Sequence, residues 1–290
     1  MSRTTAAVET RDAFVARLEA GPGGPDLGWV TQVAAALFGG QDADTARVWA
    51  VRVHEDLVRL GGRVPFTVVH DWHAHTVVPL LAEAGARRGG DGAAQEAVRA
   101  LHERALAGER AGEAEWAAAL GPALTEVYRY AYAYAEAYAT AAANARGYAM
   151  DNDFGEEKAA EFATMYAKLN TDANARSYAD ANAIAHTRLL AAAFAGADEE
   201  AFAAAYPFAY VHAYALADAE RAEQEGRAER YRAACGRLAD GFTESLARGG
   251  GGGGGPPGGG RGAGGPGPPP HGRGRVGGVV PNSGGVVAPR

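Results

Sequence analysis

An alanine-dense segment, residues 128–215, limits the folds open to this chain, and Tyr, Asn and Arg recur within it. At its start, tyrosines at positions 128, 130, 132 and 134 alternate with other residues, as in a half-buried strand. The gaps are filled mainly by alanine, which is the best helix former and a poor strand former. The segment is also far longer than an ordinary strand. It is therefore predicted to be helical.

This segment repeats part of itself. Residues 143–149 (ANARGYA) return as residues 173–179 (ANARSYA), and a looser echo links residues 128–132 with 206–210. Such copies are too few for a solenoid, which needs about three or more stacked units. They predict helices that meet through similar faces, with alanine allowing axes as close as about 8 Å. Buried tyrosines should supply much of the apolar burial, and asparagines should accept hydrogen bonds from their hydroxyls.

The rest of the chain is predicted to complete an all-α, multi-helix bundle over residues 5–248, after a disordered start at 1–4. With 290 residues and 47% apolar residues, one main domain is expected. Residues 249–290 are dominated by Gly and Pro and cannot bury a core, so they are predicted to be a disordered tail.

Gly and Pro also predict the helix boundaries. A helix over residues 66–88 should bend near Pro79, although the β-branched stretch 64–69 also allows a short strand. A long helix should be interrupted at Gly121-Pro122, and a turn should follow at residues 151–155. Two helices, 156–169 and 172–195, are then expected, and the next one should bend at Pro207.

Composition excludes several classes of function. A net charge of −7 without clustered Lys and Arg argues against nucleic-acid binding. No run reaches the roughly 18 apolar residues of a membrane span. The single Cys235 excludes an internal disulfide framework, and no targeting segment is visible, so a cytoplasmic protein is expected.

Polar residues at helical spacing form the candidate binding site. In the second repeat they recur every four residues, which predicts one polar stripe, and the first repeat carries a matching stripe. Such stripes either fix helix register as a buried hydrogen-bond network or bind a protein partner or small molecule. Arg146 has no partner on its own helix, so it either reaches solvent or binds an anion. The candidate binding residues are Asn144, Arg146, Tyr148, Asn174, Tyr178, Asn182 and His186.

A second candidate is a metal site at residues 70–75, which contain His70, Asp71, His73 and His75. Imidazole and carboxylate groups ligate zinc and other divalent ions. The D-x-H-x-H order resembles the strand-end metal motif of amidohydrolase barrels, but the chain lacks the repeated strands of that fold. On a helix, only His70 with His73, or Asp71 with His75, are spaced to share a metal. Half-buried polar packing at a helix start is the alternative.

Other catalytic templates fail. The chain has no H-E-x-x-H zinc motif, no phosphate-binding G-x-x-x-x-G-K-[ST] loop and no G-x-S-x-G nucleophile elbow. Whether it is an enzyme therefore stays open. The leading hypothesis is a helical binding or assembly module of unknown oligomeric state; the alternative is a metal-dependent enzyme that uses residues 70–75.

The amino-acid sequence of the repeats resembles that of a known group of proteins. Residues 143–146 (ANAR), 174–183 (NARSYADANA) and 206–209 (YPFA) resemble a group of actinobacterial Ala/Tyr-rich helical proteins labelled SpcZ. The similarity runs over about residues 68–248 and excludes the tail. It implies an actinobacterial cytoplasmic protein, and it brings no catalytic residues.

Overall fold

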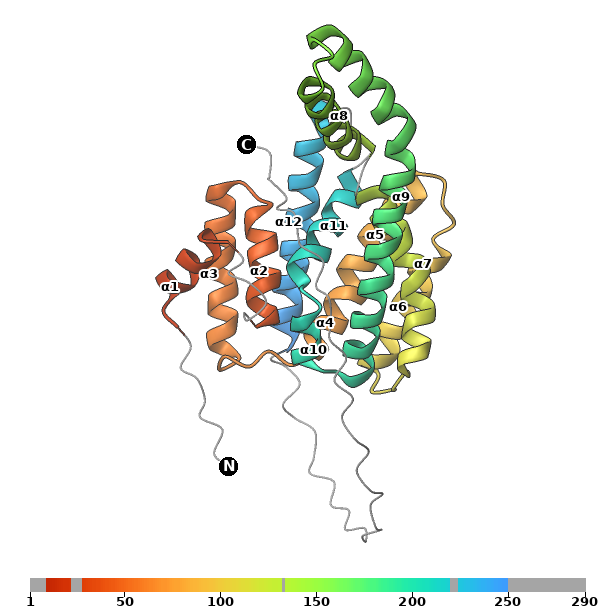
Figure 1. Cartoon of the computed structure of the whole chain (residues 1–290). Coiled ribbons are helices and arrows are strands. Elements are labelled where there is room, and N and C mark those ends of the chain that lie inside the picture. Colours follow the sequence, from red (N-terminus) through yellow and green to blue (C-terminus); the bar gives the residue numbers. More distant parts are fainter. Residues whose placement is uncertain (1–8, 22–27, 132–133, 220–223, 250–290) are drawn as a thin grey trace, which may run out of the picture. The chain divides into compact units, whose positions relative to one another are not determined.

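The structure, a computed structural model, describes residues 9–21, 28–131, 134–219 and 224–249. Throughout these ranges every regular element is helical, which confirms the predicted all-α class (Figure 1). The predicted disordered start and residues 250–290 of the predicted tail lie outside them. In chain order the elements are α1 Arg11–Glu19, α2 Trp29–Gly39, α3 Ala43–Arg59, α4 Thr67–Trp72, the π-helix η1 His73–Val77, α5 Val78–Arg87, α6 Ala93–Leu106, α7 Glu113–Ala131, α8 Tyr134–Asp151, α9 Glu156–Gly196, α10 Glu199–Ala204, α11 Pro207–Ala219 and α12 Gln224–Gly249.

The last helix, α12, ties together elements that are far apart in the sequence. It packs against α2, α3, α4, η1 and α11. Trp49 of α3 donates its indole N–H to the carbonyl oxygen of Ala239 at 2.9 Å, and Trp72 of α4 donates to that of Leu238 at 3.0 Å. Both indoles are buried, so each hydrogen bond satisfies a donor that would otherwise be costly to desolvate.

The predicted helix over residues 66–88 forms as α4, η1 and α5, and the alternative of a strand at 64–69 is wrong. The expected distortion near Pro79 is a π-turn that begins before the proline. The N–H of Val78 bonds the carbonyl oxygen of His73, five residues back. Proline lacks an N–H and crowds the preceding turn, and a widened turn accommodates it.

Helix α7 runs without a break through Gly121-Pro122, so the predicted interruption is wrong. Buried residues lie on both sides of Pro122 on one face, including Trp116, Leu120, Leu124 and Tyr128. An interior proline costs about 3 kcal/mol. Each buried large apolar side chain contributes roughly 1.5–3 kcal/mol, so packing of this face outweighs the loss.

Helix α9 is one continuous helix of 41 residues, not the two helices predicted over 156–195. The expected break rested on Asn, Thr and Asp near residues 170–172. Those residues cost less than about 0.7 kcal/mol each in a helix, and neither Gly nor Pro occurs between residues 156 and 195. The helical segment is interrupted just before Pro207. Helix α10 ends at Ala204, and Tyr206 adopts a φ of 55° before α11 begins.

Along the described ranges, no helix combines the length and the apolar run that crossing a bilayer requires.

Glycine is required where α12 approaches η1. A Cβ added at Gly241 would collide with the side chain of Thr76, whereas one added at Gly236 of the same helix would meet nothing within 4 Å. Gly241→Ala should therefore lower the free energy of unfolding by about 1–3 kcal/mol through overpacking. Gly236→Ala should raise it by roughly 0.5–1 kcal/mol, the usual gain in a helix interior. Urea unfolding followed by circular dichroism measures both, and an equal effect of the two substitutions would contradict this packing.

Candidate functional site

Helix α8 and the first part of α9 form a helical hairpin, joined by a short turn that ends at Gly155 with a φ of 72°. The two helices pack closely along their length. All the buried residues described in this hairpin are alanines, so small side chains fill the contact between the helices. They are Ala145, Ala149, Ala159, Ala163 and Ala167.

Helix α9 buries opposite sides in its two halves. Ala163 lies against α8, whereas Ala183 and Leu190 belong to the main hydrophobic core, where this half of α9 packs on α7. A helix turns about 100° per residue. Over the 20 residues from Ala163 to Ala183 this amounts to whole turns plus about 200°, so the two side chains point to nearly opposite sides of α9. A single straight helix can therefore contact α8 with one side and the core with the other.

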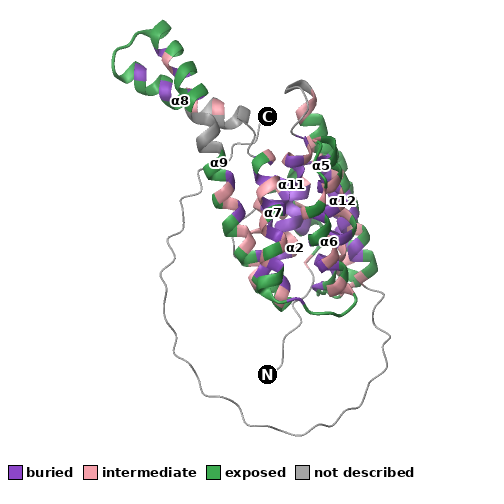
Figure 2. Ribbon diagram, turned by 90° about the vertical axis from the view of Figure 1, so that its right-hand side faces the viewer, coloured by how far each residue is buried: buried purple, intermediate pink, exposed green. Residues whose placement is uncertain are grey.

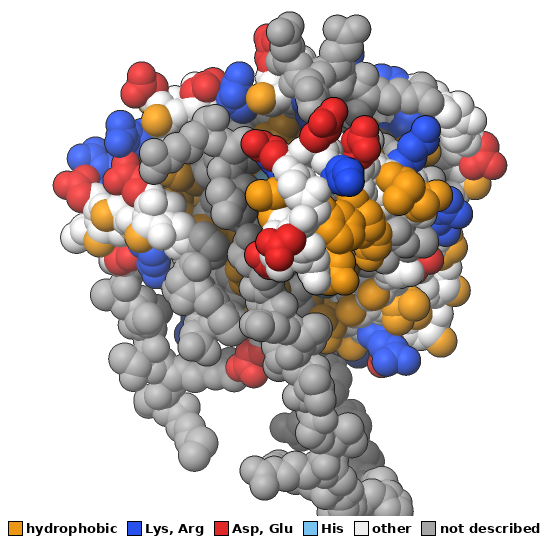
Figure 3. Space-filling view, turned by 45° about the horizontal axis from the view of Figure 1, so that its top comes forward, with side chains coloured by type: hydrophobic (Ala, Val, Ile, Leu, Met, Phe, Trp, Pro, Cys, Tyr) orange, Lys and Arg blue, Asp and Glu red, His pale blue; other side chains and the backbone are white. Residues whose placement is uncertain are grey.

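The large apolar side chains of this region point outward. Among the described residues, nine exposed large apolar side chains fall between positions 148 and 189, and two others lie on α3. The hairpin accordingly shows mostly exposed positions (Figure 2), and hydrophobic side chains gather beside charged ones on the surface (Figure 3). The nine are Tyr148, Met150, Phe154, Met165, Tyr166, Leu169, Tyr178, Ile184 and Leu189.

Several of these side chains form one continuous patch. The ring of Phe162 lies 6.2 Å from that of Tyr148, 5.7 Å from that of Phe154 and 5.9 Å from that of Tyr166, between centroids. Along α9 the patch continues as Phe162, Met165, Tyr166 and Leu169, which we call the hairpin stripe. Their spacing of i, i+3, i+4 and i+7 places them on one helix face.

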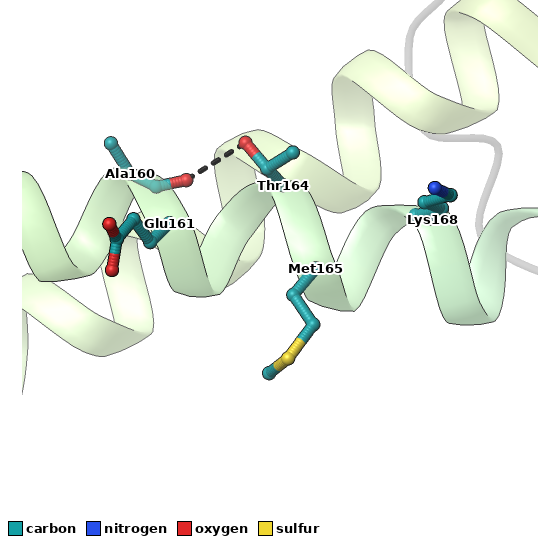
Figure 4. A pocket seen from close by; sticks show the side chains of 5 residues that line it. All are labelled: Ala160, Glu161, Thr164, Met165 and Lys168. Carbon is teal, nitrogen blue, oxygen red and sulfur yellow. Dashed lines mark hydrogen bonds between the residues drawn. The ribbon is translucent and has the colours of Figure 1, made fainter.

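A shallow depression adjoins the hairpin stripe (Figure 4). It is lined by Ala160, Glu161, Thr164, Met165 and Lys168, all from α9. Small-molecule sites are concave and bury most of their ligand between several elements. Walls from a single helix suit contact with another surface better than enclosure of a small molecule.

Where their side chains are described, the predicted polar stripes do not form a buried network. Tyr148 and Tyr178 are 61% and 60% exposed, and Asn144 is exposed. Asn182 is half-buried and donates its side-chain N–H to the carbonyl oxygen of Tyr178 at 2.8 Å, on its own helix. The side chain of Asn174 lies outside the described residues.

Helix geometry explains why the polar stripe of α9 is not buried along its whole length. Residues four apart differ by about 400°, so an i, i+4 row drifts by about 40° at each step. The row therefore begins on the solvent side at Tyr178 and reaches the core side at His186. There the ring of His186 stacks on that of Tyr128 of α7, 5.4 Å between centroids, and hydrogen-bonds its hydroxyl.

For two tyrosines, histidine takes the role predicted for asparagine as the partner of the phenol hydroxyl. Besides the pair of Tyr128 and His186, the hydroxyl of Tyr231 lies 2.6 Å from Nδ1 of His212. Arg146, the candidate anion ligand, instead donates to Glu156 across the hairpin at 2.9 Å, and both side chains are exposed. An exposed pair of this kind contributes little to stability.

The residues of the predicted metal site separate into two groups. His70 and His73 point into the core, while Asp71 accepts hydrogen bonds from Arg248 and lies beside the exposed His75. Over the described ranges, no three His, Cys, Asp or Glu side chains are arranged to hold a metal ion. The arrangement therefore gives the metal hypothesis no geometric support.

The two inward rings join a third histidine that the sequence analysis did not select, His102 of α6. Nδ1 of His70 lies 3.0 Å from Nδ1 of His102, and the rings of His73 and His102 stack with centroids 4.8 Å apart. His73 donates its Nδ1–H to the carbonyl oxygen of Val69 at 2.7 Å. No short-range pattern links residue 102 to residues 70–73, so only the tertiary fold reveals this cluster.

Burial keeps the histidine cluster uncharged. Desolvation lowers the pKa of His70 and of His73 to about 4, and it lowers the pKa of His102 well below its ordinary value. The surrounding rings are aromatic, among them those of Trp116 and Phe194. Nε2 of His73 and of His102 has no hydrogen-bond partner in the described structure, so protonating either would bury an unmatched donor. These contacts make the cluster part of the core packing.

Comparison with known proteins adds no assignment: the chain matches no protein-family model, no curated protein and no solved structure.

The histidine cluster predicts acid sensitivity. The histidines of the unfolded chain take up protons below about pH 6.5, whereas the buried rings of His70 and His73 resist protonation until about pH 4. Between these values, each of these rings should lower the free energy of unfolding by about 1.4 kcal/mol for every unit by which the pH falls. His73→Gln should reduce that slope by about one ring's share, measured by urea unfolding at several pH values. Val77→Ala, which removes packing in the same π-turn without a titrating group, should leave the slope unchanged. An unaltered slope in His73→Gln would contradict the assignment.

Proposed function

We propose that this chain is a non-enzymatic helical binding or assembly module whose contact surface is the exposed face of the α8–α9 hairpin. The observation that carries the proposal is the inverted distribution of side chains in the hairpin. Alanines lie inside, and tyrosine, phenylalanine, methionine and leucine lie outside. Contiguous exposed apolar patches mark interaction sites in soluble proteins.

The energetics of the hairpin support a partner. An alanine methyl contributes only about 0.8 kcal/mol on burial, so the contact between α8 and α9 gains little apolar burial. A large apolar side chain contributes roughly 1.5–3 kcal/mol. A partner that covers the hairpin stripe would therefore bury more favourable surface per residue than the hairpin buries itself.

The chemistry of the surface favours a macromolecule over a small molecule. Aromatic residues, Met and Arg are enriched at the centres of protein interfaces, and the hairpin exposes Tyr148, Phe154, Met165 and Arg146. The depression beside Met165 has walls from one helix only. Among the predicted binding residues, Arg146, Tyr148 and Tyr178 remain candidates for the contact, whereas His186 is a core-facing residue.

The cellular setting of this module is also a proposal. We place it in the cytoplasm, since a reducing compartment suits a single buried thiol, Cys235. An acidic surface without clustered basic residues is compatible with a protein partner and unsuited to nucleic acid. Its kinship with the actinobacterial SpcZ group stays a prediction from the wording of the repeats.

Site-specific crosslinking tests the contact surface. A photo-crosslinking amino acid at Leu169, which is 73% exposed, should trap a protein when the full chain is irradiated in the cells that make it. The same amino acid at Val58 of α3, which is 53% exposed, is the matched control and should trap nothing. Crosslinks from neither position, or equally from both, would refute the proposed surface.

A further inference from the structure

We propose that the partner of the hairpin stripe is a second copy of this chain, paired antiparallel across a two-fold axis beside Met165. This inference rests on the proposed function and names the occupant of its surface.

The hairpin stripe has the form of a helix-pairing surface. Phe162, Met165, Tyr166 and Leu169 repeat at the i, i+3, i+4, i+7 spacing by which one helix packs against another. The stripe is about 10 Å long, from the rise of 1.5 Å per residue. The rings of Tyr148 and Phe154 extend it beyond Phe162 toward the hairpin turn. A partner helix that lies along α9 would cover the whole surface.

The charges beside the stripe are self-complementary. Glu161 and Lys168 border the same depression as Met165, which lies between them (Figure 4). Seven residues separate the two charges, close to two full turns, so both lie on one side of the helix. A two-fold axis near Met165 brings Glu161 of each copy opposite the partner's Lys168. Parallel pairing would instead set like charges against each other, so the charges favour the antiparallel direction.

Two-fold pairing also explains how one short surface can suffice. In an isologous interface every contact occurs twice, so each Glu–Lys pair and each buried side chain counts double. Such an interface is closed and does not extend into fibres. The Met165 side chains of the two copies meet near the axis, and Phe162 of each copy reaches the turn between Tyr166 and Leu169 of the other. A different helical protein could cover the stripe only if it placed a basic residue opposite Glu161 and an acidic residue opposite Lys168.

Charge reversal in the purified full chain tests the pairing. Sedimentation velocity over a concentration series should show a dimer. Glu161→Lys and Lys168→Glu should each raise the dissociation constant about tenfold or more, because each sets like charges together twice. The double variant Glu161→Lys/Lys168→Glu should return to within about threefold of the original value, because opposite charges face each other again. Glu55→Lys, an equal change of charge at an exposed position of α3, should leave the dissociation constant unchanged.

The outcomes separate this inference from the proposed function. A chain that stays monomeric at every concentration, or a double variant as weak as the single ones, overturns the two-fold pairing. If Leu169 then crosslinks to a protein of another mass, the hairpin is still a contact surface, occupied by a different partner. If Leu169 crosslinks to nothing, both proposals fall. Circular dichroism of each variant confirms that the exposed substitutions leave the helices intact.

Discussion

Close contact between small side chains is the constraint on which the hairpin and its proposed function depend. Alanines at the contact between α8 and α9 let the two helices approach each other, and no large side chain fits there without moving them apart. The large apolar residues of the hairpin therefore lie on its outer sides. The small residues that build the hairpin thus also create its exposed apolar surface.

The remainder of the bundle is stabilised differently. Around α12 the core is built from large rings, with the buried indoles of Trp49 and Trp72 bonded to carbonyl oxygens of that helix. Three neutral histidines pack among aromatic rings between α4, η1 and α6. Helix α9 belongs to both regions, since it buries one side against α8 and the opposite side against the core. Because the buried face of α9 rotates along the helix, one end of α9 packs into the core and the other end forms a hairpin whose large apolar residues are exposed.

Local physics made part of this structure predictable. The high helix propensity of alanine predicted the all-α class, and Asp, Asn and Gly at residues 151–155 predicted the turn that forms between Asp151 and Glu156. Two predicted helix breaks were wrong, for different reasons. Pro122 is tolerated because α7 is buried on both sides of it, and α9 continues because weak helix formers alone do not end a helix.

The candidate site was predictable in composition and not in orientation. Tyr148 and Tyr178 were selected as binding residues, yet the expected burial of phenols against asparagines was wrong because an i, i+4 row turns gradually around a helix. Met165 and Leu169 carry no motif, and their exposure depends on which face of α9 the alanines occupy. His102 joins His70 and His73 only through folding. Sequence periodicity predicts which residues share a helix face, whereas only the tertiary fold shows which residues pack against that face.

Hydrogen exchange of the α8 amides tests the alanine contact most directly. Ala163→Leu adds bulk at a buried position between the helices, and Ala160→Leu adds the same bulk at an exposed position of the same helix. Ala163→Leu should remove protection from the amides of α8, with a cost of about 1–3 kcal/mol, whereas Ala160→Leu should preserve it. Equal protection of α8 in the two variants would mean that the alanine contact does not hold the hairpin together.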